Sequence, residues 1–299
     1  MTRAAQGEGV GFAPAKINLN LHVLGRRPDG FHRLQSLVVF ARTGDRVVLR
    51  PGAGPDDRLL LAGPFASALA EQADGENNLV MSALSRFRER FPDALAHPLT
   101  VELEKNLPVA AGMGGGSSDA AATLRLLAEL SRHPVHPDDL LALAASLGSD
   151  VPVCLNARAA LMEGTGTRLT PAPPLPPFAL VLANPGKGLS TARVFNGLAR
   201  RDNPPFDLPE QGFARLEGLV DWLRCTRNDL EPSATSLLPE TGEGLARLRR
   251  LPGSLFAAMS GSGATLFALF ANLDAARMAA EQLRKELPGY WIAAADILP

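Results

Sequence analysis

The sequence is poor in cysteine and has almost no excess of charge. Its residues include only two cysteines, Cys154 and Cys225, and five histidines. These counts exclude a disulfide scaffold and a clustered zinc site. Thirty basic residues against 31 acidic ones leave a formal net charge of -1. Since no global basic field exists, we expect no binding to bulk nucleic acid or to an anionic membrane surface.

Long apolar runs are also missing. No stretch approaches the length of a membrane span, and the first 13 residues lack the apolar centre of a secretory signal. We therefore expect a soluble, cytoplasmic protein. The 299 residues, 46% of them apolar, suggest two domains of ordinary composition. The proline-rich stretch Pro171–Pro177 is the clearest compositional break, which predicts domains over 1–170 and 171–299.

Alternating residues predict the first strand, over 15–24. Ile17, Leu19, Leu21 and Val23 would form one buried face, with Lys16, Asn18, Asn20 and His22 on the other. Considered alone, this polar face would simply face water. Two further strands are expected at 36–41 and 45–50, joined by a turn at Thr43–Gly44.

Apolar residues at helical spacing predict a helix from about residue 79 to Phe91, capped by Asn77 or Asn78. Helices at 118–131, 138–147, 215–224, 243–250 and 274–287, and around Arg193, alternate with strands at 99–103, 178–183, 264–270 and near Ile292. Because strands and helices mix without a strict βαβ rhythm, the expected fold class is α+β.

A glycine-rich segment, PVAAGMGGGSSDAA over 108–121, leads directly into a predicted helix. Glycines let backbone N–H groups approach a ligand, and a helix N-terminus favours an anion. The spacing is neither that of a Walker A loop nor the dinucleotide fingerprint. The segment therefore predicts a phosphate-binding loop, with a plain turn capped by Ser117 or Ser118 as the alternative.

Three other positions can carry chemistry. Lys16 is a compact cation, one of only four lysines in the chain. Asp150 lies between Gly148-Ser149 and Val151-Pro152, and Pro152 should keep Val151 out of the helical region. An isolated Asp is more often an Asx turn or cap. The loop Ser260–Gly263 is equally compatible with a tight turn and with a ligand contact.

Together, these motifs resemble the GHMP small-molecule kinases. The segments involved are 13–34 (APAKINLNLHVLGRRPDGFHRL), 108–121, 147–152 (LGSDVP), 227–232 (RNDLEP) and 259–265 (MSGSGAT). The resemblance covers nearly the whole chain. It implies two domains, an N-terminal ribosomal-S5-like one and a C-terminal ferredoxin-like one. The pair PAKINL and DGFH is similar to the members that phosphorylate the 2-hydroxyl of 4-diphosphocytidyl-2-C-methyl-D-erythritol with ATP, on the non-mevalonate route to isoprenoid precursors.

What the resemblance implies for the site is as follows. Asp150 would accept the hydroxyl proton, and Lys16 would hold the hydroxyl and Asp150 in register. Mg²⁺ would be held largely by ATP oxygens and water, with Ser118 a candidate ligand. The implied ATP-binding residues are Asn77, Lys105, Pro108, Val109, Ala110, Ala111, Gly112, Met113, Gly114, Gly115, Gly116, Ser117 and Ser118. The implied residues for the cytidine diphosphate substrate are Asn18, Phe31, His32 and Phe195.

Phe31 departs from the family pattern, which usually has Tyr there, so stacking area is kept and a hydroxyl is lost. In the family, the residues matching Phe31 and Phe195 stack on the cytosine, and the one matching His32 hydrogen-bonds its edge.

Two other functions compete with the kinase function that the resemblance implies: a GHMP kinase for another alcohol, and a non-catalytic ligand-binding or RNA-binding protein. The near-zero net charge argues against RNA.

Overall fold

The computed structural model describes residues 8–72 and 78–299. By their internal contacts, these residues form two units that interleave along the chain. Unit 1 comprises the described residues of three ranges, Met1–Ala15, Gly44–Val109 and Gly114–Asn156. Unit 2 comprises Lys16–Thr43, Ala110–Met113 and Ala157–Pro299. The strands β1 (Gly9–Asn18) and β3 (His32–Pro51) contribute residues to both units.

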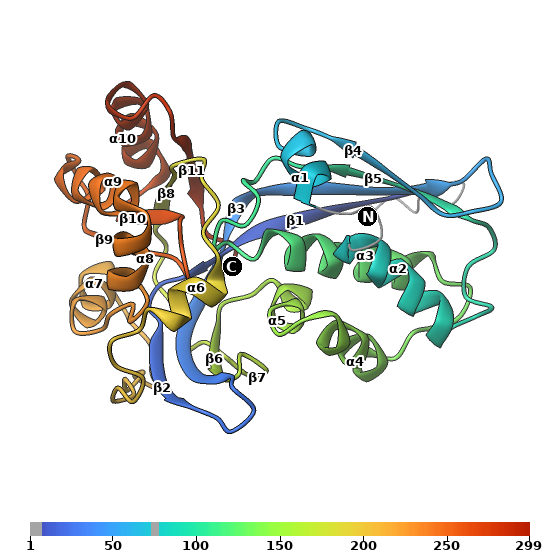
Figure 1. Cartoon of the computed structure of the whole chain (residues 1–299), viewed down its shortest axis with the longest axis horizontal. Helices are drawn as coiled ribbons and strands as arrows, with labels where there is room; N and C mark the ends of the chain where they lie inside the picture. Colours follow the sequence, from blue (N-terminus) through green and yellow to red (C-terminus); the bar gives the residue numbers. More distant parts are fainter. Residues whose placement is uncertain (1–7, 73–77) are drawn as a thin grey trace. The chain divides into compact units, whose positions relative to one another are not determined.

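Unit 1 combines a small sheet with a group of helices. The second half of β3 pairs antiparallel with β5 (Leu99–Glu104), and β4 (Arg58–Ala62) pairs in parallel with β5. Helix α1 (Ala66–Gln72) follows β4. The helices on one side of these strands (Figure 1) are α2 (Leu79–Arg90), α3 (Gly115–Leu130), α4 (Pro137–Leu147) and α5 (Val151–Asn156).

Helix α2 forms as the sequence predicts. Asn78 is its N-cap, and its side chain accepts a hydrogen bond from the N–H of Val80 at 2.9 Å. The apolar residues at helical spacing, Val80, Ala83, Leu84 and Phe87, are buried. Local capping and periodicity therefore agree with the packing against α3.

Unit 2 contains two sets of strands. β2 (His22–Arg26) and β6 (Ala160–Gly164) each pair antiparallel with the first half of β3, and β7 (Arg168–Pro171) pairs with β6. A four-stranded antiparallel sheet has the order β11-β8-β10-β9. These strands are β8 (Ala179–Asn184), β9 (Phe256–Met259), β10 (Leu266–Phe270) and β11 (Trp291–Asp296).

Five helices complete unit 2: α6 (Thr191–Asn196), α7 (Leu216–Arg224), α8 (Glu231–Leu237), α9 (Pro239–Arg250) and α10 (Leu273–Glu286). α10 packs on β8, β10 and β11, and α9 packs on β9 and β10. Side chains such as Val181, Leu248, Phe270 and Leu283 form the core of this unit. Because β8 lies between two strands and under α10, it is buried along its length.

Three predictions for the first strands are wrong. Residues 19–21 separate β1 from β2, so the predicted single strand over 15–24 is interrupted. The polar residues Lys16, Asn18, Asn20 and His22 are all at most 4% exposed and do not face water. Residues distant in the sequence cover this second face. The expected turn at Thr43–Gly44 is continuous strand within β3. Glycine is required at position 44 because the backbone of Ala13 passes close to it. A Cβ at Gly44 would lie 2.2 Å from the carbonyl oxygen of Ala13.

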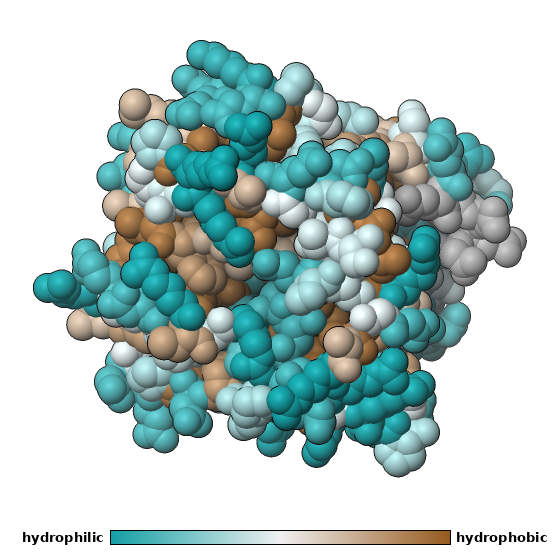
Figure 2. Space-filling view, turned by 60° about the vertical axis from the view of Figure 1, so that its left-hand side comes forward, coloured by the Kyte–Doolittle hydropathy of each residue, from teal (hydrophilic) through white to brown (hydrophobic). Residues whose placement is uncertain are grey.

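In Figure 2, hydrophilic side chains cover most of the visible face, and apolar ones appear between them in smaller areas. Phe31 and Met278 are among the large apolar side chains that remain exposed, at 66% and 73%. Among helices in the described ranges, none combines the length and apolar character that crossing a membrane requires.

Candidate active site

Two glycine-serine loops meet in unit 2. Ser260 Oγ donates to the carbonyl oxygen of Gly112 at 3.0 Å, and the N–H of Thr265 donates to the carbonyl of Ala111 at 3.1 Å. Gly112 has a positive φ of 72°, and a Cβ there would lie 2.6 Å from the carbonyl oxygen of Gly263. Only glycine fits such a contact, so MSGSGAT directly supports the first glycine loop.

The glycine loop then enters α3. Gly114, the N-cap, adopts the left-handed conformation and gives no side-chain cap. The hydroxyl of Ser118 donates to the carbonyl of Pro14, so a turn capped by Ser118 is not what forms. The N–H groups of Gly115, Gly116 and Ser117, in the first turn of a 16-residue helix, have no intrahelical acceptor. This helix start has the geometry of an anion site.

Lys105 lies beneath this helix start rather than on its surface. Its Nζ forms ion pairs with Asp45 and with Asp119, the latter at 2.8 Å, and all three residues are at most 2% exposed. The Asp45 Oδ1 atom also accepts from the N–H groups of Asn106 and Leu107. This ion cluster (Lys105, Asp45 and Asp119) thereby fixes the backbone just before Pro108.

Burial and charge compete inside the ion cluster. Burial opposes the charge of Lys105, but the carboxylates of Asp119 and Asp45 outweigh it and raise its pKa. Burial, with a contribution from Asp45 and against the effect of Lys105, raises the pKa of Asp119 to about 8. Among the described residues, Asp119 Oδ1 is buried and has no hydrogen-bond partner, so no hydrogen bond to this oxygen stabilises the ionised carboxylate.

The first strand carries Lys16 and Asn18 past these loops. The N–H of Lys16 donates to the carbonyl of Met113 at 2.9 Å. The N–H of Asn18 donates to Ser260 Oγ at 3.1 Å, and its side-chain amide donates to Ser36 Oγ at 2.7 Å. The backbone of Lys16 and Asn18 is therefore fixed by hydrogen bonds to the two glycine-serine loops.

The predicted cytosine residues form a partly exposed aromatic group. His32 stacks on Phe195 with ring centroids 4.8 Å apart, while Phe31 is 66% exposed. Burial, followed by the charges of Arg201 and Arg26, lowers the pKa of His32. Its Nε2 atom is buried and has no hydrogen-bond partner within the residues described. A neutral ring nitrogen without a partner is suited to a ligand hydrogen bond.

Asp150 directly precedes α5 in unit 1. Its carbonyl accepts from the N–H of Cys154 at 3.3 Å, and α5 begins at Val151. The prediction that Pro152 keeps Val151 out of the helical region is wrong. Proline is tolerated in the first turn of a helix, where its missing N–H costs no hydrogen bond. Asp150 therefore sits at a helix start, partly exposed.

Some site residues are placed differently from the expectation or were not predicted. Asn77 lies outside the described residues. Asp45, Asp119 and Asn228 were not singled out, because their roles come from contacts with distant segments. The only signal for Asn228 was its place in the RNDLEP motif, which gave it no role.

Comparisons with known proteins identify the family of this chain. The model of the GHMP kinases N terminal domain matches residues 78–158, and that of the GHMP kinases C terminal matches 207–289. A 4-diphosphocytidyl-2-C-methyl-D-erythritol kinase of Cereibacter sphaeroides is 51% identical over 96% of this chain and 98% of its own. One from Chelativorans is 45% identical, with 94% of each chain covered.

Solved structures show the same fold. A crystal structure of 4-(cytidine 5'-diphospho)-2C-methyl-D-erythritol kinase has a TM-score of 0.78 at 36% identity, over 97% of this chain and 100% of its own. A homoserine kinase from Cytophaga hutchinsonii shares the fold, with a TM-score of 0.70 at 18% identity over 99% and 97% of the two chains. The expected α+β two-domain GHMP kinase fold is confirmed. The chain belongs to the GHMP kinase family, among its 4-diphosphocytidyl-2-C-methyl-D-erythritol kinases.

Proposed function

We propose that this protein transfers the γ-phosphoryl group of ATP to the 2-hydroxyl of 4-diphosphocytidyl-2-C-methyl-D-erythritol, a step of the non-mevalonate route to isoprenoid precursors. The 45–51% identity to kinases of that name supports the substrate. The observation that carries the chemistry is the start of α3, where the amides of Gly115, Gly116 and Ser117 follow a glycine loop.

Phosphoryl transfer requires mainly positioning and charge compensation from the protein. In our proposal, Pro108–Ser118 binds the ATP phosphates through its backbone N–H groups. Lys105 contributes from beneath, since a Cβ on Gly115 would lie 3.0 Å from its Nζ. We propose that Lys105, which the resemblance implies for ATP binding, acts by holding the loop, because its Nζ is paired with Asp45 and Asp119. The role of Asn77 stays a prediction.

Asp150 and Lys16 are proposed as the catalytic pair, on the basis of the family motifs. The Asp150 carboxylate would accept the proton of the attacking hydroxyl as its oxygen bonds to the γ-phosphorus. Lys16 would hold that hydroxyl and the carboxylate in register. Asn18, tied to Ser260 and Ser36, would set the position of this strand beside the transferred group.

We propose Mg²⁺ as the metal cofactor: the phosphate oxygens of ATP and water would hold it, and it would supply compensation of phosphate charge. Ser118 does not fit as a ligand, because it is 0% exposed and its hydroxyl donates to Pro14. Within the described ranges, His, Cys, Asp and Glu side chains form no group of three able to hold a metal ion.

Recognition of the cytosine is proposed for Phe31, His32 and Phe195. The unpartnered His32 Nε2 would hydrogen-bond the edge of the base, and Phe195 keeps the imidazole in place by stacking on it. Phe31 offers an exposed ring for stacking on the base.

We further propose a cytoplasmic location and domains over 1–170 and 171–299.

A coupled assay of ADP release, run over several alcohols, tests the proposal. The cytidyl substrate should give the highest kcat/KM, and homoserine or mevalonate little turnover. Asp150→Asn should lower kcat about 10²–10⁴-fold and leave the dissociation constant of an ATP analogue nearly unchanged. Near-normal turnover in Asp150→Asn would refute Asp150 as the base, and a preference for another alcohol would refute the substrate.

A further inference from the structure

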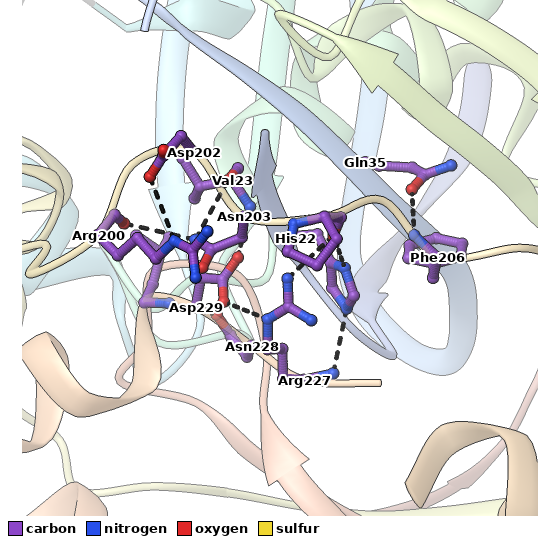
Figure 3. Close-up of polar contacts among 12 residues, drawn as sticks. His22, Val23, Gln35, Arg200, Asp202, Asn203, Phe206, Arg227, Asn228 and Asp229 are labelled. Carbon is purple, nitrogen blue, oxygen red and sulfur yellow. Dashed lines mark hydrogen bonds and ion pairs between the residues drawn. The ribbon is translucent and has the colours of Figure 1, made fainter. Parts of the chain in front are cut away.

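The segment Arg227–Asp229, part of the RNDLEP motif, lies against the start of β2 in unit 2 (Figure 3). Leu21 donates its N–H to the carbonyl of Arg227 and accepts the N–H of Asp229, both at 2.9 Å. Asp229 Oδ2 accepts the N–H of Val23 at 2.7 Å. The segment is therefore fastened to the chain that directly follows Lys16 and Asn18.

Asn228 uses its whole side chain for internal hydrogen bonds. It is 7% exposed, and its Nδ2 donates to the carbonyls of Met259 at 2.8 Å and Gly261 at 2.9 Å. Its Oδ1 accepts the N–H of Leu230 at 3.0 Å. Two donors and one acceptor are needed in this geometry, which an amide supplies and a carboxylate does not.

The carbonyls that Asn228 binds flank Ser260. Ser260 Oγ accepts the N–H of Asn18 at 3.1 Å and donates to the carbonyl of Gly112 at 3.0 Å. Gly261 is equally confined, since a Cβ there would lie 3.0 Å from the Gly112 carbonyl oxygen and 3.3 Å from Asn18 Oδ1. A shift of this loop would therefore break the link between the first strand and the glycine loop.

We infer that Asn228 is a positioning residue for phosphoryl transfer. It fixes the backbone at Met259 and Gly261 so that Ser260 joins the strand of Lys16 and Asn18 to the glycine loop at Gly112. This inference rests on the proposed function, because it assigns a supporting role in that site. In this inference Asn228 acts through Ser260, because its side chain hydrogen-bonds the backbone on either side of that residue.

Asn228→Asp is the decisive variant, because it keeps the shape of the side chain and removes both N–H donors. Its matched control is Asn203→Asp. Asn203 Nδ2 also donates to two carbonyls, those of Val23 at 3.2 Å and Arg200 at 3.4 Å, but not to the loop around Ser260. We expect Asn228→Asp to lower kcat about 10–100-fold, and Asn203→Asp to stay within about twofold of the wild type.

A purely structural defect is distinguished in two ways. Lower pH should restore part of the lost kcat in Asn228→Asp relative to wild type, because a protonated carboxyl regains one donor. In the double variant with Ser260→Ala, the two losses in kcat should not multiply, because both residues act through one loop. Asn228→Ala replaces Asn228→Asp in this cycle if the latter does not fold.

The inference is overturned if the Asn228 variants match the Asn203→Asp control, or if their losses multiply with that of Ser260→Ala. Wild-type protein is measured first on the cytidyl substrate. Absence of wild-type turnover would refute the proposed function itself, whereas normal wild-type turnover with an unaffected Asn228→Asp variant would refute only the role of Asn228.

Discussion

The imidazole of His32 and the ring of Phe195 are stacked, with centroids 4.8 Å apart and planes 25° from parallel. The two residues are far apart in the sequence, one at the start of β3 and the other in α6. The stack leaves His32 Nε2 buried and without a hydrogen-bond partner among the described residues. Phe195 therefore sets the direction in which that nitrogen can meet a ligand.

Removing this stack should weaken substrate binding selectively. Phe195→Ala should raise KM for the cytidyl substrate about 2–13-fold, the equivalent of about 0.5–1.5 kcal/mol for an aromatic pair. KM for ATP should not change. Phe195→Tyr, which keeps the ring, is the control. An equal rise in both KM values would contradict a role for Phe195 at the cytosine.

The ion cluster should matter greatly for stability. Lys105→Met leaves Asp45 and Asp119 buried without their cation, and should lower the free energy of unfolding by about 3–5 kcal/mol in urea titrations. Lys187→Met is the control, because Lys187 also pairs with a carboxylate, that of Glu240, but is 60% exposed. It should change stability little. Equal effects of the two substitutions would contradict the importance of burial.

Asp119 should give stability an unusual dependence on pH. Its pKa is raised to about 8, so between pH 4 and 8 the folded state binds more protons there than the unfolded state. This contribution to stability is full at low pH, decreases as pH rises toward 8 and levels off above it. Asp119→Asn should remove that component.

Urea titrations of wild type and Asp119→Asn at pH 5, 6, 7 and 8 measure this effect. The stability of the variant relative to wild type should increase steadily over the series. A constant difference across these pH values would show that the Asp119 pKa is not raised.

His22 should act in the opposite direction. Its Nδ1 lies 3.0 Å from the Pro204 carbonyl, and its Nε2 accepts the N–H of Arg227 (Figure 3). Burial is the main cause that lowers its pKa below 6.5. The unfolded state then binds more protons, so the stability from neutral His22 is present above pH 6.5 and is lost as pH falls below it.

Thermal unfolding between pH 5 and 7.5 checks this sign. The Tm of wild type should fall more on acidification than that of His22→Gln. His97→Gln, at an exposed position, is the control and should follow wild type. A His22→Gln variant with the same pH profile as wild type would contradict the assignment.

Local patterns predicted the local elements well. The periodicity from Val80 to Phe87 and the cap at Asn78 determine α2 almost without its neighbours. The polar side of β1 was different, because Lys16 and Asn18 are buried by loops more than 90 residues away in sequence. Gly44 resembles a turn residue locally, but it is required by the approach of Ala13.

The candidate site likewise contains residues that a local pattern predicts and residues whose roles depend on distant contacts. The glycine loop was predictable because both its composition and its position before a helix point to an anion. Lys105 was placed near the nucleotide by resemblance alone, and no pattern indicated that Asp45 and Asp119 would surround its Nζ. The role of Asn228 could not be predicted either, because its partners Met259 and Gly261 lie in a different motif, MSGSGAT.

The burial of two lysines has a practical consequence for chemical labelling. Lys16 and Lys105 are 3% and 2% exposed, whereas Lys187 and Lys285 lie at the surface. An amine-reactive reagent applied to the native enzyme should thus acylate Lys187 and Lys285 and spare the other two side chains. Peptide mass mapping before and after denaturation would reveal the two protected amines. Acylation of Lys16 or Lys105 would therefore show that the loops around them have opened.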